Sequence, residues 1–252
     1  MPIAFSPTSV AERPLAGRRI VVTRPRAQAG ALAEALQELG ATVETVPLVA
    51  IEPIAGGAEL DEALQKLDRY DWVVFTSVNG VAAAREYAEG LSTAKVAAVG
   101  PATASALRAL GTDPSYVPEQ FAAAQIAPGL EPLAGSRVLL LQADIAEPAL
   151  ADELERRGAS VDAAAAYRTI EIEPSAPELA TMRSVDAVIL ASGSAARSLA
   201  RQGGAGDALV VCIGPRTAEI ARELGLPVGL TAHEATADGI IQALTSHFGG
   251  RE

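Results

Sequence analysis

The chain contains an internal repeat, in which a pattern of apolar runs and polar turns from one half returns in the other. Asp71–Gly80, an apolar run that ends in a Thr-Ser turn, has a counterpart in Asp186–Ala195. Lys95–Ala104, which carries a Gly-Pro turn followed by a threonine, has a counterpart in Val210–Ala218. Corresponding positions lie roughly 115 residues apart, a period that predicts duplication or two similar lobes.

A further matching pair lies upstream of each of these segments. Gly17–Arg24 resembles Gly135–Gln142, and both lead through a helical pattern to a Gly-Ala-x-Val segment, at Gly40–Val43 and Gly158–Val161. The order of elements is therefore the same in both halves of the chain.

Short, continuous apolar runs alternate with helical patterns along the chain. Such runs are typical of strands that are buried on both faces, as in a parallel sheet. In one helical pattern, Leu32, Leu36 and Leu39 follow the helix period, and Gly40 is predicted to end the helix. We predict strands over 19–23, 72–75, 96–99, 138–141, 187–190 and 210–213. Alternating strands and helices predict an α/β fold with right-handed crossovers.

Two extended segments, Val43–Pro53 and Val161–Pro174, interrupt this alternation at equivalent places in the two halves. We interpret them as paired connectors between the lobes, so that the lobes interleave along the chain. The predicted divisions are a flexible leader over 1–16, one lobe from 17–45 plus 172–252, the other over 52–165, and connectors over 46–51 and 166–171.

The composition argues against several classes of function. Lys and Arg number 20 against 31 Asp and Glu, so the net charge is −11 and we expect no binding to nucleic acid. One cysteine, Cys212, and two histidines, His233 and His247, predict neither a disulfide nor a metal site. His247 is expected in a C-terminal tail. No signal peptide and no apolar stretch of about 20 residues is visible, so we expect a cytoplasmic protein without membrane contact.

Polar turns follow the predicted strands and precede the predicted helices. Ligands bind outside the carboxyl ends of strands in an open parallel sheet, and free N–H groups at helix starts attract anions. Hydroxyl side chains in such turns can also simply cap the helices. Repetition across two lobes favours a binding surface, whereas no Gly-x-Gly-x-x-Gly or P-loop spacing marks a nucleotide site. The turns are Thr23–Pro25, Thr76–Asn79, Gly100–Thr103, Ser192–Ser194 and Gly214–Thr217.

Taken in order, these motifs resemble the uroporphyrinogen-III synthase family over about residues 17–245. The resemblance implies α/β architecture, with two similar parallel-sheet, flavodoxin-like lobes joined by a two-stranded β-ladder and an active site between the lobes. The motifs that carry it are Thr23-Arg24-Pro25, Phe75-Thr76-Ser77-x-Asn79-Gly80, Val99-Gly100-x-x-Thr103-Ala104, Ala166-Tyr167-Arg168-Thr169 and Ile213-Gly214-Pro215-x-Thr217-Ala218.

The resemblance also implies an activity, that of a cyclising hydro-lyase of tetrapyrrole and haem biosynthesis that needs no metal and no cofactor. Its substrate, hydroxymethylbilane, is a linear tetrapyrrole that loses a terminal hydroxyl and closes with inversion of ring D to give uroporphyrinogen III. Closure without the enzyme gives the uninverted type I isomer. The protein must therefore hold the chain folded so that the wrong carbon does not react first.

Tyr167 is the catalytic residue that the resemblance implies, since a phenol is protonated at pH 7 and can donate a hydrogen bond to the departing hydroxyl. Packing across the ladder is its alternative role. One departure from the family pattern is Ala191, where members often carry threonine. We expect positive potential near the substrate from Arg24, Arg26, Lys95, Arg168 and Arg216. The implied substrate-binding residues are Thr23, Arg24, Thr76, Ser77, Asn79, Gly100, Thr103, Arg168, Ser192, Ser194, Gly214, Arg216 and Thr217.

Two alternatives from other classes remain open on the sequence. A two-lobed binding or sensor protein that closes on a small anionic ligand has the same architecture. A Rossmann oxidoreductase lacks its glycine fingerprint here. For the synthase, we expect a monomer whose tetrapyrrole substrate is handed over by hydroxymethylbilane synthase.

Overall fold

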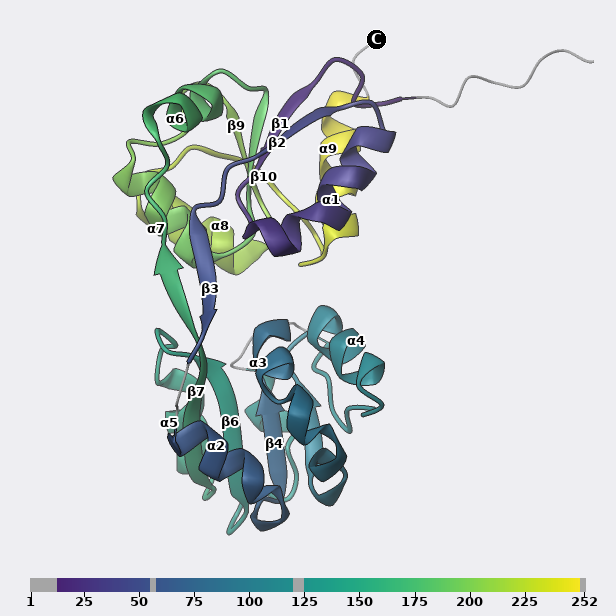
Figure 1. The fold of residues 1–252 in the computed structure, drawn as a ribbon, viewed down its shortest axis with the longest axis vertical. Helices are drawn as coiled ribbons and strands as arrows, with labels where there is room; N and C mark the ends of the chain where they lie inside the picture. The colour runs from purple at the N-terminus through teal and green to yellow at the C-terminus, as the bar shows by residue number, and fades with distance from the viewer. Residues whose placement is uncertain (1–12, 55–57, 120–124, 250–252) are drawn as a thin grey trace, which may run out of the picture. The chain divides into compact units, whose positions relative to one another are not determined.

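The computed structural model describes residues 13–54, 58–119 and 125–249. Most of the predicted leader, residues 1–12 of 1–16, lies outside the described residues. The chain divides into a split unit, Met1–Ala50 with Glu171–Glu252, and a middle unit, Ile51–Ile170 (Figure 1). The chain therefore passes from one unit to the other twice, as interleaved connectivity requires.

The split unit is built on a five-stranded sheet with the order β10-β9-β8-β1-β2. All neighbouring strands in this sheet are parallel, so their carboxyl ends lie along one edge. This is the doubly wound order 2-1-3-4-5, whose topological switch point falls between β1 and β8. The strands are β1 (Arg19–Val22), β2 (Thr42–Thr45), β8 (Ala187–Leu190), β9 (Leu209–Cys212) and β10 (Val228–Thr231).

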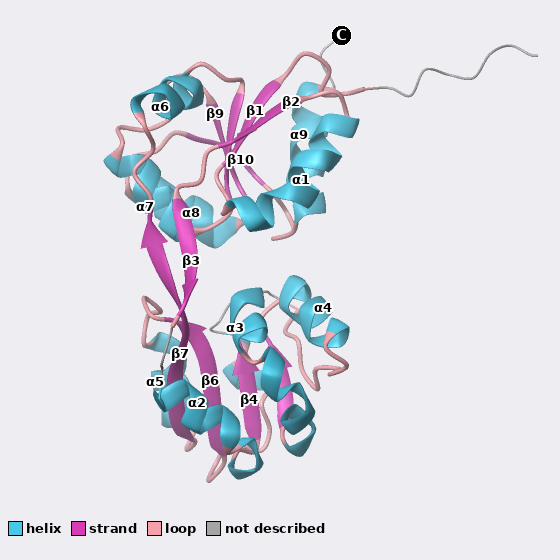
Figure 2. Cartoon of the chain, in the orientation of Figure 1, coloured by secondary structure: helices cyan, strands magenta, loops and turns pink. Residues whose placement is uncertain are grey.

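Helices cover both faces of this sheet (Figure 2). Side chains alternate along β1, so Ile20 packs with Leu36 and Ile240 on one face, while Val21 packs with Leu199 on the other. The first face carries α1 and α9, and the second carries α6, α7 and α8. Their bounds are α1 (Arg26–Glu38), α6 (Ala176–Arg183), α7 (Gly193–Arg201), α8 (Pro215–Glu223) and α9 (Ala237–Phe248).

The middle unit has a second five-stranded sheet with the order β3-β7-β6-β4-β5. The pairs β4–β5, β4–β6 and β6–β7 are parallel, and Figure 1 shows the edge strand β3 running opposite to β7. The strands are β3 (Val49–Pro53), β4 (Trp72–Phe75), β5 (Lys95–Ala98), β6 (Arg137–Ala143) and β7 (Ser160–Glu171).

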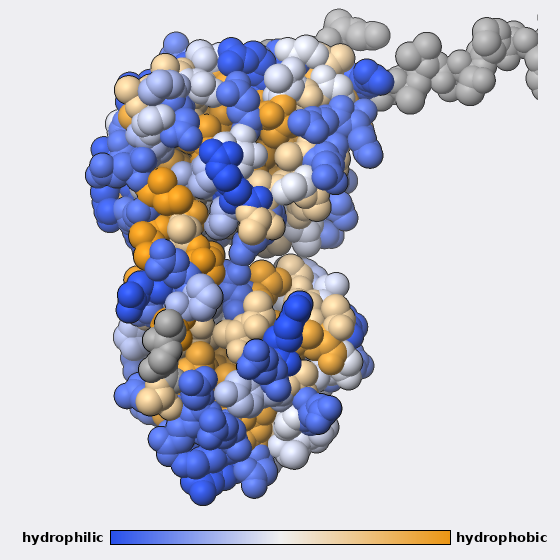
Figure 3. Space-filling view, viewed as in Figure 1, coloured by the Kyte–Doolittle hydropathy of each residue, from blue (hydrophilic) through white to orange (hydrophobic). Residues whose placement is uncertain are grey.

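The core of the middle unit also has two faces. Leu139 packs with Leu64 and Leu107 on one side of the sheet, and Leu140 packs with Leu154 on the other. The surface of α2 is hydrophilic in Figure 3, because its leucines face the core and its acidic side chains face outward. The helices are α2 (Ala58–Gln65), α3 (Val78–Ala83), α4 (Pro101–Ala109) and α5 (Ala149–Arg156), with 3-10 turns η1 (Leu67–Arg69), η2 (Arg85–Thr93) and η4 (Ala127–Gly129).

The repeat seen in the sequence corresponds to a shared strand order. The run β9-β8-β1-β2 of the split unit matches the run β5-β4-β6-β7 of the middle unit. The predicted fold class, two similar parallel-sheet lobes with interleaved connectivity, is confirmed. Residues 166–171, which the sequence predicts as a connector, form the last part of strand β7, and the division between the two units falls after Ile170.

Glycine ends α1 where the sequence predicts it. Leu39 is the last residue of the helical turn, and Gly40 follows with a φ of +98°, a left-handed conformation that strongly favours glycine. Within residues 13–54, 58–119 and 125–249, no helix combines the length and apolarity that a membrane crossing requires.

Candidate active site

The hydroxyl of Tyr167 lies against a turn of its own unit. The oxygen of Ser77, which follows β4, donates a hydrogen bond to the phenol oxygen over 2.9 Å. The same serine caps α3 by accepting a hydrogen bond from the Gly80 N–H at 3.2 Å. Tyr167 is 9% exposed, so the pair sits in a largely dehydrated place at the carboxyl end of the sheet.

A β-bulge orients Tyr167. The register of β6 against β7 shifts between Gln142 and Ala143, so that Gln142 pairs with Ala165 but Ala143 pairs with Tyr167. In a regular strand Ala166 and Tyr167 would point to opposite faces. Here both pack in the same apolar cluster, because the extra residue reverses the alternation. The bulge therefore turns the phenol toward the helices α3 and α4, which also contribute to that cluster.

Asp144 holds the backbone next to the bulge. Its N–H donates to the Tyr167 carbonyl, and its carboxylate accepts a hydrogen bond from the Thr169 N–H at 3.0 Å. The other carboxylate oxygen lies 3.6 Å from the Arg168 guanidinium. Sequence analysis missed Asp144, because no motif singles out an aspartate after a strand. Arg168, a predicted substrate contact, is thus an exposed arginine with an acidic partner.

Two of the predicted site threonines tie neighbouring strands together. The Thr23 hydroxyl, at the end of β1, donates to the Ile189 carbonyl of β8 at 2.6 Å, and Thr23 is 1% exposed. The Thr76 hydroxyl, at the end of β4, donates to the Leu141 carbonyl of β6 at 3.1 Å. Each hydrogen bond joins the two strands that flank the switch point of its sheet, β1 and β8 in the split unit and β4 and β6 in the middle unit. The repeat aligns β1 with β6 and β8 with β4, so the two threonines lie on opposite sides of that point. Thr23 therefore supplies in the split unit the link that Ala191, the counterpart of Thr76, does not make.

Replacing Thr23 with valine is expected to lower the free energy of unfolding by about 1–3 kcal/mol, because a buried hydrogen bond is lost without a change of shape. Thr76→Val should cost less, since Thr76 is partly exposed and its bond is longer. Urea denaturation of both variants measures this, with Thr23→Ser as the control that keeps the hydroxyl. Wild-type stability of Thr23→Val combined with a raised KM would instead make Thr23 a substrate contact.

The Gly-Pro turns leave backbone N–H groups at the starts of α4 and α8 without a side-chain cap. Gly100 caps α4 and Gly214 caps α8, each in extended conformation, each followed by proline, and each without a side chain that could cap the helix. Thr103 and Thr217, at the third helical position, are 5% and 7% exposed. Within the described parts of the chain, neither hydroxyl has a hydrogen-bond partner. An anion at such a helix start meets free N–H groups and a hydroxyl.

The remaining predicted contacts in the turns are partly engaged. Ser192 caps α7 by accepting a hydrogen bond from the Ala195 N–H at 3.1 Å. Ser194 is half-buried in the first turn of that helix. Arg216 forms an exposed ion pair with Glu219 at 2.8 Å. Asn79 also has an interaction partner in the structure. The structure therefore brings these residues to the carboxyl edges of their sheets, where helix capping uses part of their hydrogen-bonding capacity.

Arg24 differs from the other predicted cations. Its guanidinium is half-buried and, among the residues that the structure describes, has neither an ion pair nor a hydrogen bond. Burial lowers the pKa of Arg24 from its ordinary value, since desolvation disfavours the charged form. By contrast, Arg26 lies 3.7 Å from Glu178, and the Lys95 ammonium donates to the Glu131 carbonyl at 3.1 Å. An unpaired, partly desolvated cation at the switch point is suited to an anionic ligand.

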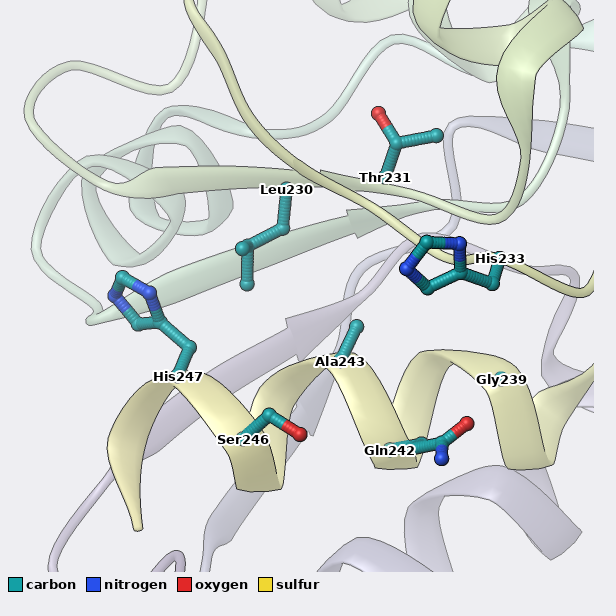
Figure 4. A pocket seen from close by; sticks show the side chains of 8 residues that line it. All are labelled: Leu230, Thr231, His233, Gly239, Gln242, Ala243, Ser246 and His247. Carbon is teal, nitrogen blue, oxygen red and sulfur yellow. The ribbon is translucent and has the colours of Figure 1, made fainter. Parts of the chain in front are cut away.

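A groove of about 460 Å³ lies between β10 and α9 of the split unit (Figure 4). His233, after β10, and His247, in the last turn of α9, lie at its two ends. The predicted tail position of His247 is thus wrong, because α9 continues to Phe248. None of the predicted site residues lines this groove.

The described residues also include the other reactive groups that the sequence analysis considered, a cysteine and potential metal ligands. Cys212 is buried, and burial raises the pKa of its thiol to about 11, so the thiol stays protonated and inert at neutral pH. No group of three or more His, Cys, Asp or Glu side chains within the described ranges has the arrangement of a metal site.

Comparison with known proteins bears on the identity of this fold. A family model described as uroporphyrinogen-III synthase HemD matches residues 30–242. The uroporphyrinogen-III synthase of Synechococcus elongatus is 28% identical over 259 aligned residues, which cover 93% of this chain and 97% of that protein. The porphyrin biosynthesis protein HemD of Ruminiclostridium josui is 28% identical over 95% of this chain, which spans 50% of that protein's length.

Solved structures agree with the fold. A mutant uroporphyrinogen III synthase of Thermus thermophilus has a TM-score of 0.62 at 20% identity, covering 90% of this chain and 96% of that one. The uroporphyrinogen-III synthetase of Helicobacter pylori also has a TM-score of 0.62, at 18% identity, covering 89% and 97%. The function class predicted from the ordered motifs is that of the family whose model matches most of both units. The chain belongs to the uroporphyrinogen-III synthase family, whose enzymes close the tetrapyrrole ring in haem biosynthesis.

Proposed function

We propose that this chain closes hydroxymethylbilane to uroporphyrinogen III, with Tyr167 assisting loss of the terminal hydroxyl and the turns of both units binding the substrate carboxylates. The observation that carries this proposal is the Ser77–Tyr167 hydrogen bond at the carboxyl edge of the middle sheet. It leaves a phenol hydrogen free at the place where parallel sheets bind their ligands.

The first step is departure of the hydroxyl. The electron pair of the terminal pyrrole nitrogen expels it, and Tyr167 donates a hydrogen bond to the leaving oxygen, which departs as water once it has gained a proton. The resulting azafulvene is attacked by the substituted carbon of ring D, giving a spiro intermediate. Fragmentation and reclosure invert ring D, and loss of a proton from the new junction restores the pyrrole. The balance is one hydroxymethylbilane to one uroporphyrinogen III and one water.

The second requirement is a folded substrate. Acetate and propionate carboxylates suit the half-buried guanidinium of Arg24 and the open helix starts after Gly100 and Gly214. Because ring closure without inversion proceeds unaided, binding must favour the approach of the substituted carbon. This places most of the catalytic effect in positioning and leaves Tyr167 a smaller share.

Assembly and location are further parts of the proposal. A monomer is sufficient, since one chain carries both sets of turns. Hand-over from hydroxymethylbilane synthase is favoured by the tendency of the free substrate to close to the wrong isomer. A cytoplasmic location fits a chain whose single cysteine is buried and unpaired.

Incubation of the protein with freshly made hydroxymethylbilane tests the activity. The oxidised products are separated into type I and type III isomers, and the type III isomer is expected to dominate with the protein and to be absent without it. A two-lobed anion binder would bind product, measured by calorimetry, but leave the type I isomer as the only product. That second result would overturn the proposed activity.

A further inference from the structure

The oxygen of Ser77 has two hydrogen-bond partners, the Gly80 N–H and the Tyr167 hydroxyl. It accepts a hydrogen bond from the Gly80 N–H at 3.2 Å and lies 2.9 Å from the Tyr167 hydroxyl. A serine hydroxyl carries one hydrogen and two lone pairs. The Gly80 N–H occupies one lone pair and leaves the hydrogen of Ser77 available, which the serine donates to the phenol oxygen in the structure.

The surroundings strengthen this contact. Tyr167 packs in an apolar cluster with Phe75, Val81 and Leu141, where little water competes for the hydroxyl groups. In such surroundings successive hydrogen bonds polarise one another. Donation from Gly80 makes Ser77 a better donor, and donation from Ser77 makes Tyr167 a better donor in turn.

We propose that Ser77 is a positioning residue for Tyr167: it orients the phenol so that the phenol hydrogen points to the leaving hydroxyl of the substrate. This inference rests on the proposed catalytic role of Tyr167. It also revises the sequence prediction for Ser77, because the serine acts through Tyr167 and does not bind the substrate.

The split unit shows that helix capping does not explain the pair. Ser192, the counterpart of Ser77, caps α7 with the same geometry, accepting from the Ala195 N–H at 3.1 Å. All four tyrosines of the chain lie in the middle unit, so Ser192 caps its helix with no phenol in its own unit. The contact with Tyr167 is therefore an addition to the capping role of Ser77.

The test uses steady-state kinetics on hydroxymethylbilane, isomer analysis and thermal melts of full-length variants. Ser77→Ala is expected to lower kcat by about three- to tenfold, the effect of one lost hydrogen bond, with KM changed by less than about twofold. Ser77→Thr keeps both hydrogen bonds and should restore kcat. Ser77→Ala combined with Tyr167→Phe should have the kcat of Tyr167→Phe alone, because the serine acts through the phenol.

Thr236→Ala is the matched control. Thr236 caps α9 by accepting from the Gly239 N–H at 3.0 Å, so this change removes a helix cap of the same kind far from Tyr167 in the sequence. It should lower the melting temperature as Ser77→Ala does and leave kcat unchanged.

Two results would overturn the inference about Ser77 and leave the proposed role of Tyr167 intact. One is a wild-type kcat in Ser77→Ala while Tyr167→Phe is slow. The other is a raised KM with multiplying effects in the double variant, which would make Ser77 a substrate contact. A wild-type kcat in Tyr167→Phe would instead overturn the proposed role of Tyr167, whatever Ser77→Ala does.

Discussion

Tyr167→Phe is expected to lower kcat by roughly 10- to 100-fold and to leave KM almost unchanged. General acids typically contribute about 10²–10⁴-fold, and the effect here falls at or below the lower bound of that range because the pyrrole nitrogen already drives the hydroxyl out. The phenol hydrogen bond forms with the departing oxygen, so its loss is felt in turnover more than in binding. Steady-state rates of type III isomer formation measure the change.

Tyr70→Phe controls for the loss of a buried phenol. Tyr70 is 7% exposed, packs in the same apolar cluster, and donates to Asp162 at 2.8 Å. Burial and the Asp162 carboxylate raise the pKa of Tyr70 to about 12. It precedes β4, at the opposite end of that strand from Ser77, so Tyr70→Phe should cost stability but not turnover. Equal kcat in wild type and Tyr167→Phe would leave Tyr167 a packing residue.

Arg24→Met is expected to raise KM by about 10- to 150-fold, because a charge-assisted hydrogen bond to a carboxylate contributes about 1.5–3 kcal/mol. The same substitution should weaken substrate binding but should not destabilise the fold. Arg24 is half-buried without a partner among the described residues, and burial without a partner disfavours its charge in the free protein. The variant should therefore unfold at the same or a higher temperature than the wild type.

Arg19→Met is the control for this prediction. Arg19 begins the same strand, lies at the opposite edge of the sheet, and forms an exposed ion pair with Glu44 at 3.2 Å. Its loss should change both KM and stability little, since exposed ion pairs contribute at most about 1 kcal/mol. A lowered melting temperature together with a normal KM for Arg24→Met would show that the guanidinium serves the fold and not the substrate.

The strands and turns were predictable because the sequence patterns that encode them are local. A run such as Trp72–Phe75 can only be buried on both faces, and Gly40 permits the left-handed turn that ends α1. The repeat of such runs, with paired connectors, was enough to predict two interleaved lobes. The order of the motifs predicted the family, and the family match confirms it.

Such local patterns do not predict contacts between segments that are far apart in the sequence. The sequence alone determined which side chains follow strands β1 and β4, namely Thr23, Arg24 and Ser77, and the family resemblance of its motifs pointed to Tyr167. Only the tertiary structure decided what each one touches. Tyr167 points to the same face as Ala166 because of the bulge opposite Ala143. The Thr23 hydroxyl donates to a carbonyl of β8, a strand that lies far away in the chain. The physical reason is that register and burial are properties of paired strands, whereas periodicity and turn chemistry are properties of one segment.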